Sequence, residues 1–297
     1  MEKAYIILAH RYPDQVYRLI QRLDDKHAFF FVHIDKKTDI SLFDEVLELN
    51  KVQMVERVKL NWAGFGFVQA IINGMMAVKE SSKQFDRIIL LSGQDYPIKS
   101  NDYINKFLHN SEFTVFLESF LLPNHKKWHP RGGLYRIDKY YFGMQWFQRY
   151  TAKSLNFLGL LIPALKRKMP ADLKPFAGST WWIIDMPALE YILNYIKSNP
   201  WYLAFHKRTF AADEIFFQTI LLNATDKSIR ESILNNNKRL IKWQDLHAAH
   251  PEELTKQDMN DIINSNALFA RKFNMQKSPD VLGLIDTYCL SGNYSDN

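Results

Sequence analysis

Short apolar runs alternate with amphipathic stretches along the first third of the chain. Four short runs are expected to form strands, at residues 4–9, 29–34, 52–55 and 88–92, and the last of them suits a strand buried on both faces. Helical spacing of apolar residues fills the gaps between them, at residues 15–23, 42–49 and 67–79. Pro13 and Ser41 are expected to begin the first two helices. The alternation predicts an α/β fold whose central sheet is mostly parallel and flanked by helices.

The rest of the chain repeats these elements less regularly. Strands are expected at residues 114–118, 179–185 and 238–243, and helices at 187–196, 213–222 and 255–263, the last capped by Thr255. Between them, residues 121–149 are too polar for a core and too aromatic for a linker. No shift in composition divides the chain. We therefore predict a single domain over residues 1–297, with residues 121–177 as an insertion over one edge of the sheet.

The predicted strand at residues 88–92 ends abruptly in polar and turn-forming residues. Gly93, Gln94 and Asp95 follow it directly, and Tyr96 and Pro97 come next. Ligands of open α/β sheets bind beyond the carboxyl ends of the strands. A binding site is therefore expected at this point.

The net charge of the chain bears on which kind of ligand the expected site binds. The 297 residues carry a net charge of +6, and no run of Lys and Arg is longer than the three residues 166–168. A single anionic ligand such as a nucleotide diphosphate accounts for this balance as well as nucleic acid does, and so does a solvated basic surface. Because no nucleic-acid motif is present, nucleic-acid binding is not expected. The single cysteine, Cys289, excludes an intramolecular disulfide and suits a reducing compartment.

Membrane features are weak in the sequence. Residues 1–9 are typical of a strand rather than a signal peptide. The apolar stretch at residues 155–165 is too short to span a bilayer. Residues 155–169 join apolar residues to a basic tail, which suits either contact with a membrane surface or a core helix with a solvated end. Peripheral membrane association is one of these two interpretations.

No metal site is expected. No aspartate has a second aspartate two residues further on, and hard divalent cations need clustered oxygen ligands. Four histidines lack the spacing of a zinc site, namely His10, His33, His247 and His250. Glycine-rich phosphate loops are missing as well. Cationic groups remain, Arg271-Lys272 and Lys238-Arg239 with Lys242, which suit either a diphosphate or a solvated face.

Two further pairs suit either structure or chemistry. Asp213 and Glu214 stand at the predicted start of an apolar helix, where Asp213 is expected to cap the helix and Glu214 could act as a general base. Trp181 and Trp182 are adjacent in a predicted strand and so point to opposite faces. Either both pack in the core, or one faces a cleft and stacks on a sugar ring.

Eight short segments, in order, resemble the core-2/I-branching family of β-1,6-N-acetylglucosaminyltransferases, which includes the peptide xylosyltransferases. They lie at residues 4–10, 33–37, 62–65, 91–99, 178–179, 213–214, 239–243 and 268–273. The resemblance implies a GT-A-like nucleotide-sugar transferase fold and an inverting, metal-independent transferase with a UDP-sugar donor. N-acetylglucosamine is the expected sugar, and UDP-xylose or another UDP-hexose is the alternative. A non-catalytic glycan- or nucleotide-binding module is a further alternative, which would be expected to lose its carboxylate.

The resemblance also assigns roles to residues. Glu214 matches the family's catalytic base, and Lys272 its diphosphate-binding lysine. The family's companion arginine is missing upstream, so Arg271, His250 or Lys242 is expected to supply the second charge. Ala211-Ala212 replaces the usual Ser-Pro before Asp213, which we interpret as a local change of the loop.

The remaining assignments divide into two sides of the site. Donor-side residues are expected at His10, Asp35, Gly93, Gln94, Asp95 and Arg271, and acceptor-side residues at Trp128, Arg131, Ser179, Trp181 and Trp243. The acceptor is expected to be a glycan or a lipid-linked saccharide. Lumenal relatives carry several cysteines and a membrane anchor, whereas this chain has a single cysteine and no recognisable anchor. This difference predicts a cytoplasmic bacterial enzyme at the inner face of the membrane.

Overall fold

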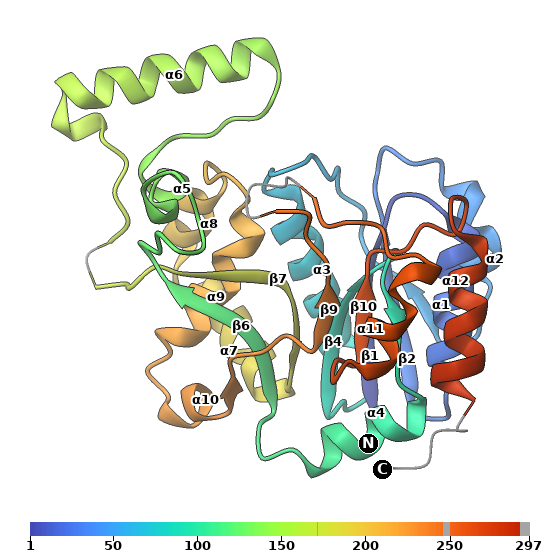
Figure 1. Cartoon of the computed structure of the whole chain (residues 1–297). Helices are drawn as coiled ribbons and strands as arrows, with labels where there is room; N and C mark the ends of the chain where they lie inside the picture. The colour runs from blue at the N-terminus through green and yellow to red at the C-terminus, as the bar shows by residue number, and fades with distance from the viewer. Residues whose placement is uncertain (171, 246–249, 292–297) are drawn as a thin grey trace.

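A seven-stranded sheet forms the centre of the computed structural model, which describes residues 1–170, 172–245 and 250–291 (Figure 1). The strand order is β3-β2-β1-β4-β7-β6-β8. The bounds are β1 Lys3–Ala9, β2 Ala28–Ile34, β3 Val52–Met54, β4 Arg87–Ser92, β6 Val115–Leu121, β7 Phe176–Ile184 and β8 Ile233–Leu234. Strands β1 to β4 are parallel, β7 runs antiparallel to both its neighbours, and β8 is parallel to β6. The predicted α/β fold with a mostly parallel sheet is confirmed.

Helices cover both faces of this sheet. The longer ones are α1 Pro13–Leu23, α3 Gly66–Glu80, α4 Asn101–Asn110, α6 Trp146–Leu161 and α7 Met186–Ser198. The shorter ones are α2 Asp44–Leu47, α5 Tyr135–Asp138, α8 Pro200–His206, α9 Phe216–Leu222, α10 Lys227–Glu231, α11 Met259–Asn264 and α12 Pro279–Ile285. Alternate residues of β1 divide between the two cores, because successive strand side chains point to opposite faces. One core contains α3, α7 and α9, and the other contains α1, α4 and α12.

A second, three-stranded sheet brings the C-terminal part of the chain to the end of β4. It has the order β5-β10-β9, with β5 Tyr96–Pro97, β9 Arg239–Ile241 and β10 Phe269–Arg271. The buried side chain of Gln15 joins the two regions, since its Nε2 donates to the carbonyls of Gly93 (3.1 Å) and Phe273 (3.2 Å). Residues far apart in the sequence therefore meet beyond the carboxyl end of β4.

Two predicted helix starts are wrong. Asp39, and not Ser41, caps the turn at Ile40–Phe43, because its side chain accepts from the Ser41 backbone N–H. The predicted helix at 213–222 is broken: a 3-10 turn, Ala212–Glu214, precedes α9, and Asp213 makes no capping bond. Its carboxylate accepts from Thr180 instead, at 2.7 Å. The predicted Thr255 cap is confirmed, with a reciprocal bond from Asp258.

Gly178 of β7 has a structural role, because it lies where β7 passes very close to β6. Pairing of β6 with β7 shifts register between Leu117 and Ser119, and the two backbones approach closely there. A Cβ atom on Gly178 would lie 1.8 Å from the carbonyl oxygen of Glu118. No side chain fits at this position unless the strands separate.

Replacing Gly178 with alanine should therefore lower the free energy of unfolding by about 2 kcal/mol or more, measured by denaturant titration. Gly283→Ala is the matched control, because a Cβ there meets only the end of the Arg18 side chain, at 3.8 Å, within helix α12. That control should be neutral or stabilising by about 0.5–1 kcal/mol. Equal effects of the two substitutions would show that the close approach at Gly178 is not a constraint.

Candidate active site

The parallel strands β1, β2 and β4 end at the same edge of the sheet. Arg11 follows β1, Asp35 follows β2, and Gln94 and Asp95 follow β4. β7 reaches this edge from the opposite direction, since Ile183 pairs with Ile89 of β4. Its earlier residues Thr180 and Trp181 therefore lie beside the end of β4.

Asp95 is fully buried and acts as an internal counter-ion. Its Oδ1 accepts from Arg271 Nε at 2.9 Å and from Ser92 Oγ at 2.7 Å, and its Oδ2 accepts from the Ser92 backbone N–H at 3.1 Å. The Arg271 guanidinium also lies over the ring of Trp181, 4.3 Å from its centroid. Asp95 thus fixes the position of Arg271, and Trp181, expected to be an acceptor-side residue, packs against Arg271.

Arg11 joins this cluster and was missed in the sequence. Its Nη2 donates to Gln94 Oε1 at 3.1 Å, and Gln94 Nε2 donates to the carbonyl of Phe273 at 3.2 Å. A cation two residues beyond the end of the first parallel strand was the signal that could have found it. Gln94 therefore holds a cation at the edge of the sheet.

The cations here lie close enough to affect each other's ionisation. Partial burial and the nearby Arg271, Arg11 and Lys277 lower the pKa of Lys272, although Glu253 opposes this shift. Partial burial lowers the pKa of His250, and Lys272, Arg11 and Arg271 lower it further. Positive charge in excess of its local counter-ions favours an anionic ligand. We call Arg11, Arg271 and Lys272 the cation cluster, and His250, whose lowered pKa leaves its side chain neutral at pH 7, lies beside it.

The other predicted cations are engaged elsewhere. Lys242 Nζ pairs with Asp258 at 2.6 Å and Glu252 at 3.9 Å. Arg239 is buried and donates to the carbonyl of Leu90 at 2.8 Å, so it joins the two sheets. Of the three residues expected to replace the missing arginine, Arg271 and His250 therefore lie with Lys272, whereas Lys242 is already neutralised. His247 lies outside the described residues.

The acid pair stands on the far side of β7. Thr180 Oγ1 donates to Asp213 Oδ2 at 2.7 Å, and Arg136 of α5 forms an ion pair with Glu214. Burial raises the pKa of Asp213 to about 6, and the neighbouring Glu214 carboxylate adds to this effect. Glu214 keeps 33% of its side chain exposed, so it can meet a ligand.

Arg136 is a second residue that sequence reasoning missed. Its guanidinium lies 3.6 Å from the centroid of the Trp128 ring and 5.4 Å from that of Phe210. Burial works against the charge of Arg136, but Glu214 and Tyr135 raise its pKa above the usual value. Trp128 therefore supports the residue that holds Glu214.

Asp35 and His10 shape the loops beside the cluster. Asp35 is almost fully buried, and its Oδ1 accepts from the backbone N–H groups of Lys37 (3.0 Å) and Leu60 (3.1 Å). The His10 carbonyl accepts from Thr38 Oγ1 at 2.9 Å. Partial burial, together with Arg11, lowers the pKa of the His10 side chain.

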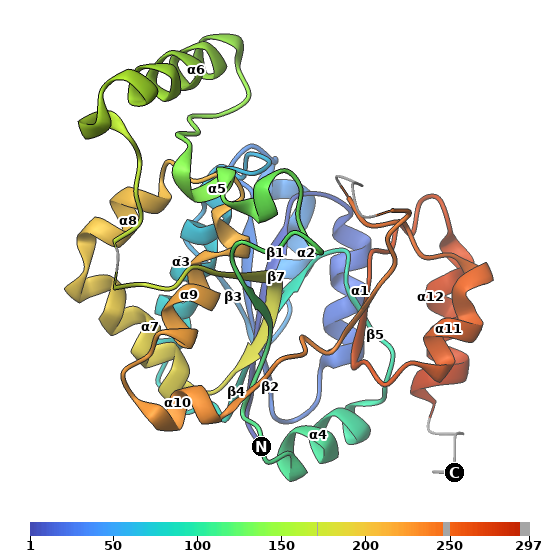
Figure 2. The same ribbon diagram turned by 60° about the vertical axis from the view of Figure 1, so that its left-hand side comes forward.

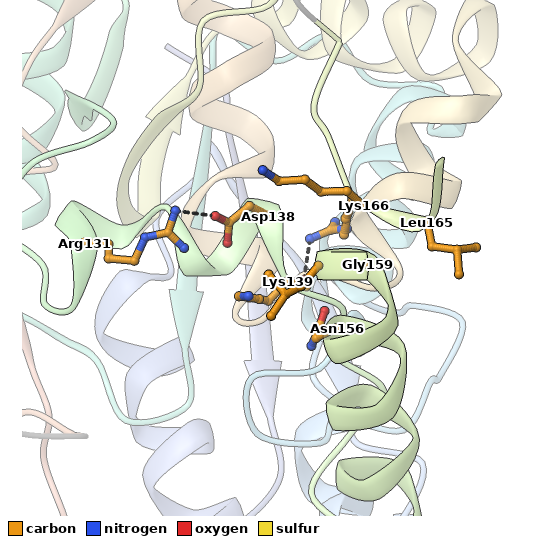
Figure 3. Close-up of a pocket in the computed structure, with 9 residues that line it drawn as sticks. Arg131, Asp138, Lys139, Asn156, Gly159, Leu165 and Lys166 are labelled. Carbon is orange, nitrogen blue, oxygen red and sulfur yellow. Dashed lines mark hydrogen bonds and ion pairs between the residues drawn. The ribbon is translucent and has the colours of Figure 1, made fainter. Parts of the chain in front are cut away.

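The remaining acceptor-side candidates are dispersed. Trp243 is 49% exposed. Ser179 uses its backbone carbonyl to accept from Gln218 Nε2 at 2.6 Å. Arg131 pairs with Asp138 at 2.7 Å and lines a separate pocket with Lys139, Asn156 and Lys166 (Figure 3). The structure therefore brings Trp128 to Glu214 but places Arg131 in another hollow.

Within residues 1–170, 172–245 and 250–291, no three His, Cys, Asp or Glu side chains come together in a way that could hold a metal ion. In the same part of the chain, no helix is both long and apolar enough to cross a membrane.

Several known proteins are similar to nearly the whole of this chain. The family model for the core-2/I-branching enzyme matches residues 3–263. Xylosyltransferase 2 of Rattus norvegicus is 26% identical over 318 residues, which cover 98% of this chain and 34% of that protein. Xylosyltransferase 1 of Homo sapiens is 24% identical over 314 residues, covering 98% of this chain and 30% of that protein. The chain thus spans about a third of the length of these relatives.

Among solved structures, the similarity is low. The 4-diphosphocytidyl-2C-methyl-D-erythritol synthase of Anaerococcus prevotii aligns with 68% of this chain and 75% of its own, at 12% identity and a TM-score of 0.33. A TM-score this low carries no argument about function.

The raised pKa of Asp213 predicts how stability depends on pH. Between about pH 4 and pH 6, folded Asp213 holds a proton that the unfolded chain has lost, so this carboxyl reduces stability as the pH rises through that window. Asp213→Asn keeps an oxygen for Thr180 and removes the charge. The variant should be more stable than the wild type by about 1–2 kcal/mol at pH 7.5 and equal to it near pH 4. Thermal and denaturant unfolding across this range measure the difference, and a gap that does not change with pH would contradict the assignment.

Proposed function

Because the chain belongs to the core-2/I-branching enzyme family, we propose that it is an inverting glycosyltransferase that moves a sugar from a UDP-sugar to a hydroxyl group of a glycan. The observation that carries this proposal is the separation of charge across β7. The cation cluster lies on the side of Trp181, and Glu214 lies on the side of Thr180. The donor diphosphate needs positive charge nearby, and the acceptor hydroxyl needs a carboxylate that can take its proton.

The reaction is a single displacement at the anomeric carbon. The acceptor oxygen attacks from the face opposite UDP while Glu214 takes its proton. The bond from the anomeric carbon to the phosphate oxygen breaks, and UDP leaves with an added negative charge. Lys272 and Arg271, with Arg11 beside them, stabilise this charge. Their fixed positive charge supports the proposal that the reaction needs no metal ion.

Arg136 fits the role of a positioning residue for the base. Its ion pair with Glu214 holds the carboxylate, whose oxygens would accept the proton, in one position. Its contacts with Trp128 and Phe210 fix the guanidinium, and therefore fix the carboxylate beside the acceptor side. The acceptor hydroxyl would meet the exposed part of the Glu214 side chain.

The identity of the donor sugar has two candidates. We propose N-acetylglucosamine from UDP-N-acetylglucosamine, as the family name implies. UDP-xylose is the second candidate, and it is supported by the names of the xylosyltransferases that match nearly the whole chain. The acceptor is proposed to be a glycan or a lipid-linked saccharide. Thermal-shift and hydrolysis screens of UDP-N-acetylglucosamine, UDP-xylose, UDP-glucose and UDP-galactose separate the donor candidates.

Glu214→Gln should lower the rate of UDP release by about 10²–10⁴-fold, because the amide cannot accept the acceptor proton. UDP binding, measured by calorimetry, should stay within about twofold, since Glu214 lies away from the cation cluster. Wild-type turnover should persist in excess EDTA. Wild-type rates in Glu214→Gln would refute the role of the base, and loss of turnover with EDTA would refute metal independence. Failure to turn over any donor would favour a non-catalytic binding module.

Lys272→Met and Arg11→Met should each weaken UDP binding about 10- to 100-fold, because each removes one charge from the diphosphate site. Lys242→Met is the matched control, since that lysine is paired with Asp258 and Glu252. The control should bind UDP as the wild type does. If Lys242→Met weakened binding as much as Lys272→Met, the diphosphate site would lie elsewhere.

A further inference from the structure

Helix α6 carries a row of large apolar side chains that the rest of the described chain leaves uncovered. It projects from the body of the molecule in both views (Figures 1 and 2). The exposed fractions are 81% for Trp146, 70% for Tyr150, 61% for Phe157 and 67% for Leu161. Their spacing of four, seven and four residues puts them on one face of a helix.

The opposite face of α6 is the one that meets the protein. Asn156 bonds the backbone of Tyr140 at both its N–H (2.8 Å) and its carbonyl (3.1 Å). Gly159 is buried against the backbone of Leu165 and Lys166. These contacts fix the orientation of the helix, and the apolar row therefore points away from the rest of the protein.

The distribution of charged residues around α6 indicates which kind of surface would cover this apolar row. Residues 139–170 contain six Lys and Arg residues and no Asp or Glu, namely Lys139, Arg149, Lys153, Lys166, Arg167 and Lys168. The whole chain has 38 basic and 32 acidic residues, so the remainder is balanced at 32 of each. The entire net charge of +6 therefore belongs to this one segment. Arg167 is buried, and the other five cations are at least partly exposed.

We propose that residues 139–170, with α6 lying flat, dock the protein on an anionic membrane surface. A helix with a Trp and Tyr row flanked by Lys and Arg suits the boundary between headgroups and acyl chains. Lys153 and Arg149 flank the row and can reach the headgroups while their stems lie along the apolar layer. At 16 residues the helix is about 24 Å long, which is too short to span a hydrocarbon core of about 30 Å.

The location of α6 suits the candidate site. β1 starts beside the amino terminus, so its carboxyl end points toward the side on which α6 lies (Figure 1). Helix α5, which carries Arg136, lies between α6 and the sheet in both views (Figure 2). Docking through α6 therefore turns the acceptor side of the site toward the membrane. The docking itself does not depend on the proposed reaction.

Vesicle flotation of the full chain tests the proposal. The wild type should float with phosphatidylcholine vesicles that contain about 30% phosphatidylglycerol, bind pure phosphatidylcholine at least about tenfold more weakly, and detach in about 0.5 M salt. The combined variant Trp146→Ser, Tyr150→Ser, Phe157→Ser and Leu161→Ser should lose at least about tenfold in binding. A second combined variant carries Lys153→Gln, Lys166→Gln and Lys168→Gln. It should lose binding to the anionic vesicles, while its weaker binding to pure phosphatidylcholine should not change.

Matched controls change the same chemistry elsewhere. Leu42→Ser, Met54→Ser and Met76→Ser remove exposed apolar side chains, and Lys197→Gln, Lys207→Gln and Lys256→Gln remove exposed charges. Both sets should bind vesicles within about twofold of the wild type. All variants should keep their rate of UDP release, which separates this test from that of the proposed function. The proposal would be overturned if the wild type did not bind anionic vesicles. It would also be overturned if replacing the apolar row left vesicle binding unchanged and only converted a dimer to a monomer in sedimentation experiments.

Discussion

The buried ion pair between Asp95 and Arg271 is the interaction on which the candidate site depends. Asp95 has no exposed surface, and Arg271 keeps only 15% of its side chain exposed. A buried pair of this kind is costly to break, because the remaining charge would be left without a partner. The pair fastens the end of β4 to the end of β10. Because Lys272 directly follows Arg271, the pair also fixes the position of Lys272, which takes no part in the pair.

β7 joins the two halves of the site through adjacent residues. Trp181 lies under Arg271, and Thr180 binds Asp213. Since neighbouring strand side chains point to opposite faces, one strand supports the cation cluster on one side and the acid pair on the other. Gly178 lets β7 approach β6 closely just before these residues. The separation between the two halves is thus set by backbone geometry, which is rigid, rather than by long side chains.

Much of the framework could be predicted from the sequence, because β1, β2 and β4 are mostly apolar runs. The positions of Asp35, Gln94 and Asp95 followed from the strand ends. Arg136 could not be assigned, since its partner Glu214 lies 78 residues away. Arg11 was overlooked although it closely follows the end of β1, because its partner Gln94 lies 83 residues away. Of the second sheet, the strand at residues 238–243 was predicted and is β9, whereas β5 and β10 were missed, because strands of two or three residues carry too little periodicity. Asp213 was misassigned as a cap because its actual partner, Thr180, is a tertiary contact.

The membrane-docking segment and the base are mechanically linked. Arg167 lies at the end of the segment and donates to the carbonyls of Arg136 (3.0 Å), Lys139 (2.9 Å) and Phe205 (2.8 Å). Burial lowers its pKa to about 10, which still leaves it charged at neutral pH. One guanidinium therefore holds the backbone of the residue that pairs with Glu214 and the return of the chain from α6. Any displacement of α6 on a membrane would be transmitted to Arg136 first, so the two features are best understood as one unit facing the acceptor.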